Sequence, residues 1–478
     1  MRLSFKMWMV LLLSALASQQ IGAQTKSWSL AQCIDTAILN NLNVLQGANT
    51  IELNRLGLKQ SKNNLLPSVN GSLSEALGVG RMVNPVTQQY QTGTTWTTGA
   101  GLTVTQNLFA GLQYLNAIKQ SELIYRSSRY DFEDVKFNLT ISVVNGFLQV
   151  LYTGEAIKIA QTQLSLDSSQ LQTTSDLAYV GKRTQSDLLQ IKAQLHADQY
   201  TVVNGQSQWR LAKVNLQQLM NLPMSDAFDI DYNTAVEPSQ TKPEDVGSIY
   251  SQSLGFQPII KSYDLKTLSA LYAVKIAKGA YYPQLMFKGT FGTDYVSSAK
   301  QSVTTYGSTL QNIGYLQSNP AELVMGNVPQ VSTSVNNYPF GNQLKDNLNG
   351  NFSIGLSLPI LNYLQVRNNV KKQEVNLNNA ALNENIIKLN LRKTIEQVYT
   401  NAGNSEALYR SAQEEVDASK AAYDISVARF EEGKEITTDL LVQKSVYIKA
   451  VSDYLQAKYG LLFNTKILDY YKGIPITF

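Results

Sequence analysis

Two short stretches of the sequence carry side chains of reactive type at the same spacing. They read VGKRTQSDLL at 180–189 and EGKEITTDLL at 432–441. Each holds a glycine, a lysine, a hydroxyl residue and an aspartate in the same order: Gly181, Lys182, Ser186 and Asp187 in the first, and Gly433, Lys434, Thr438 and Asp439 in the second. Two converging carboxylates are the machinery of a glycoside hydrolase. Because each aspartate lies in an equivalent turn of a repeated stretch, a hydrolase has little support, and we expect no enzymatic activity.

The same residue types are the ones that join two helices through a tight turn. Glycine adopts a positive φ at the end of a helix without steric cost. A hydroxyl side chain caps the next helix, and a carboxylate in the first turn of that helix faces the positive end of its dipole. We therefore predict helix–helix turns at about 180–187 and about 432–439, with Ser186 and Thr438 as the caps.

The rest of the sequence offers little catalytic or metal-binding material. His196 is its one histidine and Cys33 its one cysteine, so a Ser-His-Asp triad, a His-rich metal site and an internal disulfide all lack partners. We expect His196 on a helix surface or seam, and Cys33 as a small buried side chain on a short helix. No P-loop or GxGxxG pattern is present, and a formal net charge of +4 is too weak to indicate a nucleic-acid partner. The sequence predicts no cofactor and no metal.

Residues 1–23 have the pattern of a secretory signal peptide. Arg2 and Lys6 form a basic start, an apolar run covers 7–17, and small residues permit cleavage after Ala17 or Ala23. The run is much shorter than the ~20 apolar residues of a membrane-spanning helix. We expect an exported mature chain without a transmembrane helix.

The expected mature chain repeats itself. Residues 107–223 match 359–475 without a gap. Apolar residues recur every seven positions in both copies, at Leu188, Leu195, Val202, Trp209 and Leu216, and at Leu440, Tyr447, Tyr454, Leu461 and Leu468. Sustained seven-residue spacing is typical of long helices that pack side by side. Because proline breaks helices, its absence from 360–474 permits a helix from about 362 to 428, which would be ~100 Å long.

This duplication predicts the domain organisation. Each repeat reads helix, β-hairpin, long helix, tip turn, helix. The first repeat covers 24–223, a linker with Pro238 and Pro243 covers 224–256, and the second repeat covers 257–478.

Four segments alternate apolar and polar residues, as strands with two unlike faces do. They form predicted hairpins at about 67–107 and about 284–359, the second with a loop rich in Ser, Thr, Asn and Gly at roughly 297–347. Strands of about ten residues have the length of membrane-spanning β-strands, although the same pattern fits a soluble sheet with one face on a core. Four strands cannot close a barrel that holds a channel. If they cross a membrane, three copies of the chain would give twelve strands.

In this order the motifs resemble those of the TolC family of outer membrane efflux channels. They are LAQCIDTAILNN at 30–41, NLLPSV at 64–69, TQNLFAG at 105–111 and GKRTQSDLL at 181–189, with YYPQL, SLPILNY and GKEITTDLL in the second repeat. The resemblance implies a mixed α and β membrane protein. It would be a homotrimer with a 12-stranded β-barrel in outer membrane lipid, four strands per chain, continued by a long periplasmic α-helical barrel of coiled-coil-like helices.

The resemblance also implies partners and roles. The duct would be passive and would work with an inner-membrane transporter and a periplasmic adaptor (membrane fusion) protein. The adaptor would dock on the tips at Gly181, Lys182, Gly433 and Lys434, and carboxylates such as Asp439 would ring the closed aperture. Three positions depart from the family pattern: Phe430 replaces an aromatic hydroxyl, Glu435 an arginine and Val442 a second acidic residue. The interactions that close the tip must therefore differ.

Three functions fit these observations. The first is the outer membrane channel of a tripartite efflux system. The second is the outer membrane duct of a type I protein secretion system. The third, from another class, is a periplasmic coiled-coil scaffold or adhesin with a soluble sheet. The transported substrate is not encoded in these motifs.

Overall fold

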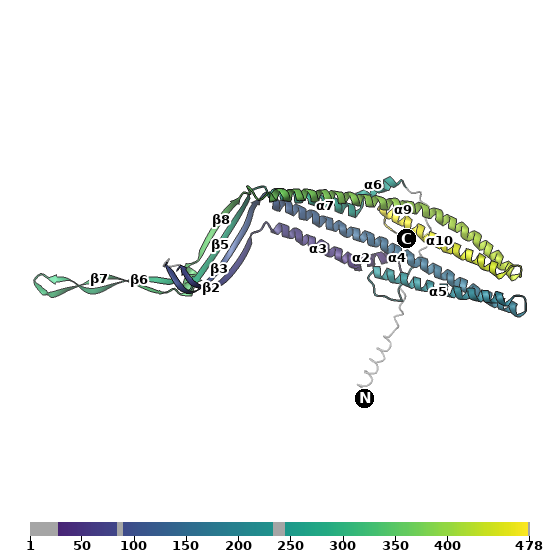
Figure 1. Cartoon of the computed structure of the whole chain (residues 1–478), viewed down its shortest axis with the longest axis horizontal. Coiled ribbons are helices and arrows are strands. Elements are labelled where there is room, and N and C mark those ends of the chain that lie inside the picture. Colours follow the sequence, from purple (N-terminus) through teal and green to yellow (C-terminus); the bar gives the residue numbers. More distant parts are fainter. Residues whose placement is uncertain (1–26, 84–88, 233–243, 477–478) are drawn as a thin grey trace, which may run out of the picture. The chain divides into compact units, whose positions relative to one another are not determined.

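The computed structural model describes residues 27–83, 89–232 and 244–476 (Figure 1). The predicted signal peptide and its cleavage positions lie outside these residues, as do Pro238 and Pro243 of the predicted linker.

The helices confirm the internal duplication. Corresponding helices have the same length in both repeats, 11, 22, 67 and 35 residues. In the first repeat they are α2 (Leu30–Asn40), α3 (Leu42–Asn63), α4 (Gln113–Tyr179) and α5 (Gln185–Leu219). In the second they are α6 (Val246–Phe256), α7 (Pro258–Gly279), α9 (Gln365–Glu431) and α10 (Thr437–Tyr471). One boundary was wrong, because α6 lies inside the predicted linker and is the counterpart of α2.

The chain divides into two compact units. The first holds residues up to 56, residues 122–270 and those from 376 onward, and it is mainly helical. All ten residues of the seven-residue pattern are buried or half-buried here, which confirms that stripe as a packing seam. A core around the fully buried Phe147 and Leu216 joins α2, α4 and α5, and it also buries Cys33 as expected. A two-residue parallel bridge between β1 (Ser27–Trp28) and β4 (Asp229–Ile230) lies against this core.

The second unit holds residues 57–121 and 271–375, and its centre is a four-stranded antiparallel sheet. The strand order is β2 (Ser68–Val83), β3 (Tyr90–Ala110), β5 (Gln284–Val296), β8 (Asn349–Ser357). The first two strands have 16 and 21 residues, longer than the expected ten. Both outer strands, β2 and β8, have one edge without a strand partner among the described residues.

The register separates an apolar face of the sheet from a polar one. One row across the four strands is Val69–Val104–Gly289–Phe352. The next row, on the opposite face, is Asn70–Thr103–Thr290–Asn351. Large apolar side chains on the first face are exposed in the single chain, with 80% of Leu73 and 67% of Ile354 accessible. The predicted alternation is therefore present, and its apolar side is uncovered.

The predicted loop at 297–347 is mostly a second β-hairpin. Strands β6 (Lys300–Leu316) and β7 (Asn319–Asn337) pair antiparallel along nearly their whole length. The short helix α8 (Phe340–Asp346) follows and packs beside β5. Composition rich in Ser, Thr, Asn and Gly suggested a loop, but the alternation of these residues with Val, Leu and Tyr supports a ribbon.

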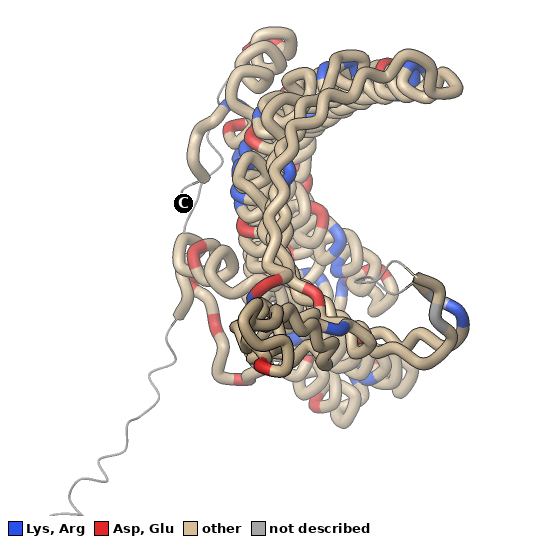
Figure 2. The backbone as a smooth tube through the Cα atoms, turned by 90° about the vertical axis from the view of Figure 1, so that its left-hand side faces the viewer, with Lys and Arg blue, Asp and Glu red and all other residues tan. Residues whose placement is uncertain are grey.

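Charged residues of both signs are interspersed along the helices (Figure 2). Within the described residues, no helix combines the length and the hydropathy needed to cross a membrane.

Candidate functional site: the paired helix tips

The first predicted tip turn joins α4 to α5 and has the expected glycine geometry. Gly181 has a φ of +76°. The Gly181 N–H donates to the Ala178 carbonyl at 3.1 Å, and the Lys182 N–H donates to the Leu177 carbonyl at 2.8 Å. These two bonds form a Schellman motif, which satisfies the last carbonyls of α4.

The second tip, between α9 and α10, repeats this geometry. Gly433 has a φ of +77°, and the N–H groups of Gly433 and Lys434 donate to the carbonyls of Phe430 and Arg429. A Cβ added to either glycine would meet open space. The positive φ alone therefore explains the glycine at each tip.

The predicted caps, Ser186 and Thr438, were wrong. Helix α5 begins one residue before Ser186, and its cap is Thr184, whose hydroxyl accepts from the Asp187 N–H at 3.1 Å. The Asp187 carboxylate accepts in return from the Thr184 N–H at 3.0 Å, which completes a capping box. Helix α10 has Ile436 at the equivalent position and therefore lacks a side-chain cap.

Asp187 also connects the two tips. Its second carboxylate oxygen accepts from the Thr437 hydroxyl at 2.5 Å, and Thr437 is buried in the first turn of α10. The hydrogen bonds from Thr437 and Thr184 hold the pKa of Asp187 below its usual range, because they favour the ionised form. The carboxylate is thus ionised at neutral pH and bonded to both helical hairpins.

Arg183, which the sequence analysis did not select, makes the other connection. Its guanidinium lies 3.9 Å from the centre of the Phe430 ring and donates to the Glu435 carbonyl at 3.1 Å and to the Phe430 carbonyl. The Phe430 ring is fully buried beneath it. The Glu435 carboxylate instead accepts from the Ser426 hydroxyl. A cation over an aromatic face with two hydrogen bonds is a strong local contact.

Two of the three departures noted in the sequence, Phe430 and Glu435, therefore belong to one arrangement around Arg183. The arginine expected two residues after the second glycine stands two residues after the first, at the equivalent position. Comparing the two tips position by position would have revealed this exchange. The remaining predicted residues, Lys182, Thr438 and Asp439, are exposed at the tips, and Lys434 forms an exposed ion pair with Glu432 at 2.6 Å.

A buried charge cluster lies behind the tips. Lys444 of α10 contacts the carboxylates of Asp167 on α4 and Asp198 on α5, and these side chains are only 3%, 9% and 12% exposed. Gln163 and Gln194 each donate to one of the carboxylates. The equivalent positions of the other repeat are Lys192, Ser419 and Ala450, so the cluster exists once per chain.

Burial sets the ionisation of this cluster. Desolvation, followed by the neighbouring Asp198, raises the pKa of Asp167 to about 6. Burial also acts to raise the pKa of Asp198, but hydrogen bonds from Asp167 and Lys444 outweigh it and lower that pKa. With the proton on Asp167, one ammonium faces one carboxylate and the cluster is neutral.

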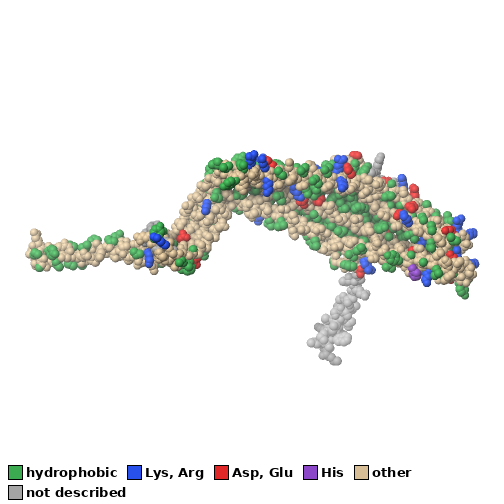
Figure 3. Space-filling view, in the orientation of Figure 1, with side chains coloured by type: hydrophobic (Ala, Val, Ile, Leu, Met, Phe, Trp, Pro, Cys, Tyr) green, Lys and Arg blue, Asp and Glu red, His purple; other side chains and the backbone are tan. Residues whose placement is uncertain are grey.

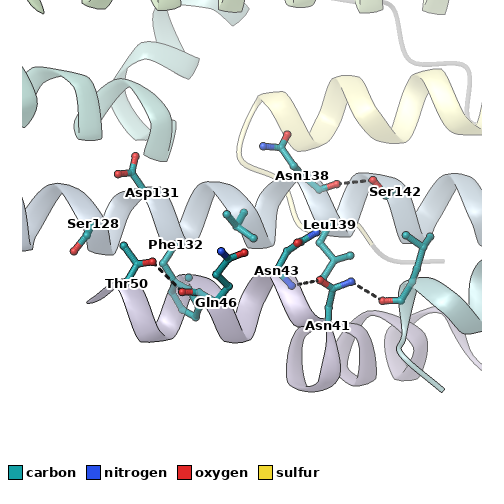
Figure 4. A pocket seen from close by; sticks show the side chains of 13 residues that line it. Asn41, Asn43, Gln46, Thr50, Ser128, Asp131, Phe132, Asn138, Leu139 and Ser142 are labelled. Atoms are coloured by element: carbon teal, nitrogen blue, oxygen red, sulfur yellow. Dashed lines mark hydrogen bonds between the residues drawn. The ribbon is translucent and has the colours of Figure 1, made fainter. Parts of the chain in front are cut away.

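A groove of about 550 Å³ opens between α3 and α4, and Asn41 and Leu219 also line it (Figure 4). The Asn41 amide donates to the Leu219 carbonyl at 2.9 Å, and the Asn43 N–H donates to the Asn41 side chain at 2.9 Å. Asp131 is the one ionisable side chain among the described residues that line the groove. Its carboxylate already accepts hydrogen bonds from the Ser262 hydroxyl and the Lys266 ammonium. The groove is therefore a polar packing seam, which leaves the tips as the candidate functional site.

Comparison with known families gives a match over both repeats. The family described as "Outer membrane efflux protein" matches residues 33–222 and 325–466. Both tip turns fall inside these ranges.

Individual relatives are distant in sequence. The pyoverdine export outer membrane protein OpmQ of Pseudomonas putida is 27% identical over 182 residues, which cover 38% of this chain and 37% of that protein. The toxin and drug export protein A of Aggregatibacter actinomycetemcomitans is 20% identical over 91% of this chain and 84% of that protein.

Solved structures share the fold along nearly the whole chain. The Campylobacter jejuni CmeC outer membrane channel superposes with a TM-score of 0.73 at 17% identity and covers 93% of this chain and 85% of that one. The outer membrane protein VceC of Vibrio cholerae superposes with a TM-score of 0.70 at 12% identity and covers 94% and 97%.

Proposed function

The chain belongs to the outer membrane efflux protein family, and from this premise we propose that it is the exit duct of a tripartite efflux system. The resemblance to TolC-family channels is thereby confirmed, as is placement in the outer membrane with a helical part in the periplasm. The finer proposal is a passive homotrimeric duct, which an inner-membrane transporter energises through a periplasmic adaptor.

The open sheet carries this proposal. A four-stranded sheet with two free edges leaves backbone groups unpaired, which a membrane does not tolerate. Three chains would join the β2 edge of one copy to the β8 edge of the next and would close twelve strands. The apolar face would then contact lipid, and the row of Asn and Thr residues would line the lumen.

The tips are the proposed docking surface of the adaptor. Gly181, Lys182, Gly433 and Lys434 are exposed there, on two turns that Arg183 and Asp187 hold side by side. The exposed Asp439 is the carboxylate that we propose for the closed aperture.

Two neighbouring residues of β8 give a matched test. Ile354 lies on the apolar face and Ser353 on the polar face. On a lipid face, lysine costs ~2–4 kcal/mol near the bilayer centre, whereas a lumen face tolerates it. We expect Ile354→Lys to lower the yield of SDS-resistant trimer in outer membranes strongly, and Ser353→Lys to preserve trimer and bilayer conductance. Equal yields of both variants, or a water-soluble monomer, would contradict the proposal.

Protein export is the second candidate, since a relative over most of the chain is named for toxin as well as drug export. Deletion of the gene separates the two functions. Retention of dyes with normal secretion supports drug efflux, and loss of a secreted polypeptide with normal dye efflux supports protein export.

A further inference from the structure

The hairpin of β6 and β7 is a two-stranded ribbon whose two faces differ. Its register pairs Tyr306 with Val331 and Tyr315 with Leu323, so these four side chains lie on one face. We call this the apolar face, and its apolar members are Tyr306, Leu310, Tyr315, Leu323, Met325, Pro329, Val331 and Val335. Hydrophobic patches run along the ribbon in Figure 3, uninterrupted by charge on the face drawn until its base.

The opposite, polar face satisfies its own side chains. The Thr309 hydroxyl and the Gln330 amide bond at 3.3 Å, and the Gln311 amide donates to Thr309 at 3.4 Å. Ile313, which bulges out of β6, folds across Gly326 on this face. This face also carries Val303, Val324 and Val328, but it has fewer large apolar side chains than the apolar face and no aromatic ones.

The apolar face is uncovered in the single chain. The accessible fraction is 81% for Tyr306 and 65% for Leu310. An isolated two-stranded ribbon is at best marginally stable in water, and exposed apolar patches of this kind mark interaction sites. The length and regularity of these strands therefore indicate that something covers this face.

The base of the ribbon is fixed to the sheet. The fully buried Gln343 of α8 donates to the carbonyls of Val296 and Tyr338 and accepts from the Val296 N–H at 3.0 Å. The Tyr338 N–H donates to the Ala299 carbonyl at 3.3 Å. The ribbon thus leaves the sheet from a defined point at the C-terminal end of β5 (Figure 1).

We propose that the apolar face of the ribbon is the contact surface for the same face of the ribbons of two sister chains. This inference rests on the proposed trimer, in which a shared barrel would bring three ribbons to the same outer end. Tethering to one barrel raises their effective concentration without a new binding partner. Residues 300–337 contain two charged residues, Lys300 and Glu322, so self-contact meets little like-charge repulsion. A ribbon that binds anionic lipid headgroups would instead carry clustered lysine and arginine.

Contact through faces rather than edges also agrees with the sequence. Pro329 lies within β7, opposite Ser308. Proline has no N–H to donate to a new strand, and it is the residue that protects free strand edges. Sister ribbons therefore meet by packing their side chains.

Cysteine substitutions at neighbouring residues test this proposal. In a Cys33→Ala background, which leaves no other cysteine, Leu310→Cys and Val331→Cys place a thiol on the apolar face, whereas Thr309→Cys and Gln330→Cys place it on the polar face. Membranes are treated with copper-phenanthroline, which accepts the electrons released as two thiols form a disulfide. Because a disulfide needs Cβ atoms about 4 Å apart, we expect at least about ten-fold more linked dimer from the apolar-face variants.

The same samples separate the possible failures. SDS-resistant trimer is measured alongside the linked dimer. Normal trimer with no disulfide, or with equal disulfide from both faces, overturns the ribbon contact and leaves the trimer intact. Absence of trimer in the unmodified protein overturns the proposed function itself. Quenching by brominated lipid of a fluorophore attached to the new thiol of the Leu310→Cys variant, without cross-linking, would assign the face to the membrane and also overturn the proposal.

Discussion

Replacement of Lys444 by methionine tests whether the buried cluster stabilises the helices behind the tips. Methionine keeps most of the volume of the side chain but removes its ammonium. Asp167 and Asp198 would then share a site that is about nine-tenths buried, with no cation between them.

The expected loss is large because one partner of a buried ion pair is removed. Such removal costs about 3–5 kcal/mol, since the remaining charge stays buried without compensation. At 1.4 kcal/mol for each factor of ten, local opening of α4, α5 and α10 should become roughly 10²- to 4 × 10³-fold more frequent. The loss should shrink toward pH 5, where both carboxyls take up protons more readily.

Hydrogen exchange on the intact protein in detergent measures this opening segment by segment. Lys449→Met is the matched control, because Lys449 is on the same helix and forms an exposed pair with Asp453. Its removal should cost no more than about 0.5 kcal/mol. Adding Asp167→Asn and Asp198→Asn to Lys444→Met removes the buried charge and should recover most of the protection.

Similar loss of protection in Lys444→Met and Lys449→Met would refute the buried-charge reasoning. Failure of the triple variant to recover would show that Lys444 acts through packing alone.

Three further predictions concern the same region. The pKa of Asp167 is raised to about 6 from 3.8, so the folded state binds a proton that the unfolded state releases; local stability should therefore fall by up to about 3 kcal/mol as pH rises from 4 to 7, and exchange in Asp167→Asn should lose this pH dependence. Arg183→Ala removes a cation–π contact and two hydrogen bonds, so it should speed hydrogen exchange at both tips about ten-fold and raise bilayer conductance. Lys182→Ala is the control. Equal exchange rates and equal conductance in the two variants would contradict the tip contact. Gly181→Val should destabilise the turn by about 1–2 kcal/mol because Gly181 has a positive φ, and hydrogen exchange across the turn measures this loss. Gly181→Asn should be tolerated. Normal efflux and normal hydrogen exchange in the valine variant would count against the turn assignment.

The helical part of the fold was predictable because its signals are local and repeated. Heptad spacing and absence of proline placed α9 within three residues of its observed bounds. The aspartates were correctly placed in the first turns of α5 and α10. The cap of α5 was misplaced because two hydroxyl residues, Thr184 and Ser186, stand near the start of this helix, and only geometry selects Thr184. The cap of α10 was wrong because this helix begins after Ile436, so Thr438 lies inside it and no side chain caps it.

Long-range contacts were beyond the sequence. Arg183 of the first repeat contacts Phe430 of the second. Lys444 on α10 contacts Asp167 on α4 and Asp198 on α5, and both aspartates are far from it in the sequence. The ribbon was missed for a different reason. The Ser, Thr, Asn and Gly content of 297–347 predicted a loop. The pairing of β6 with β7 depends instead on a register that no single residue specifies.

Corresponding helices have equal lengths in the two repeats, and this restricts where residues can be inserted into the chain. One residue inserted in α4 would turn all that follows by about 100° and would rotate its apolar stripe away from its neighbours. An insertion between β5 and β8 disturbs no such alignment. The difference in length between the two hairpin regions is accordingly concentrated beyond the sheet, in the β6–β7 ribbon. The helices therefore keep a fixed length in both repeats, whereas the β6–β7 ribbon can change in length without disturbing their packing.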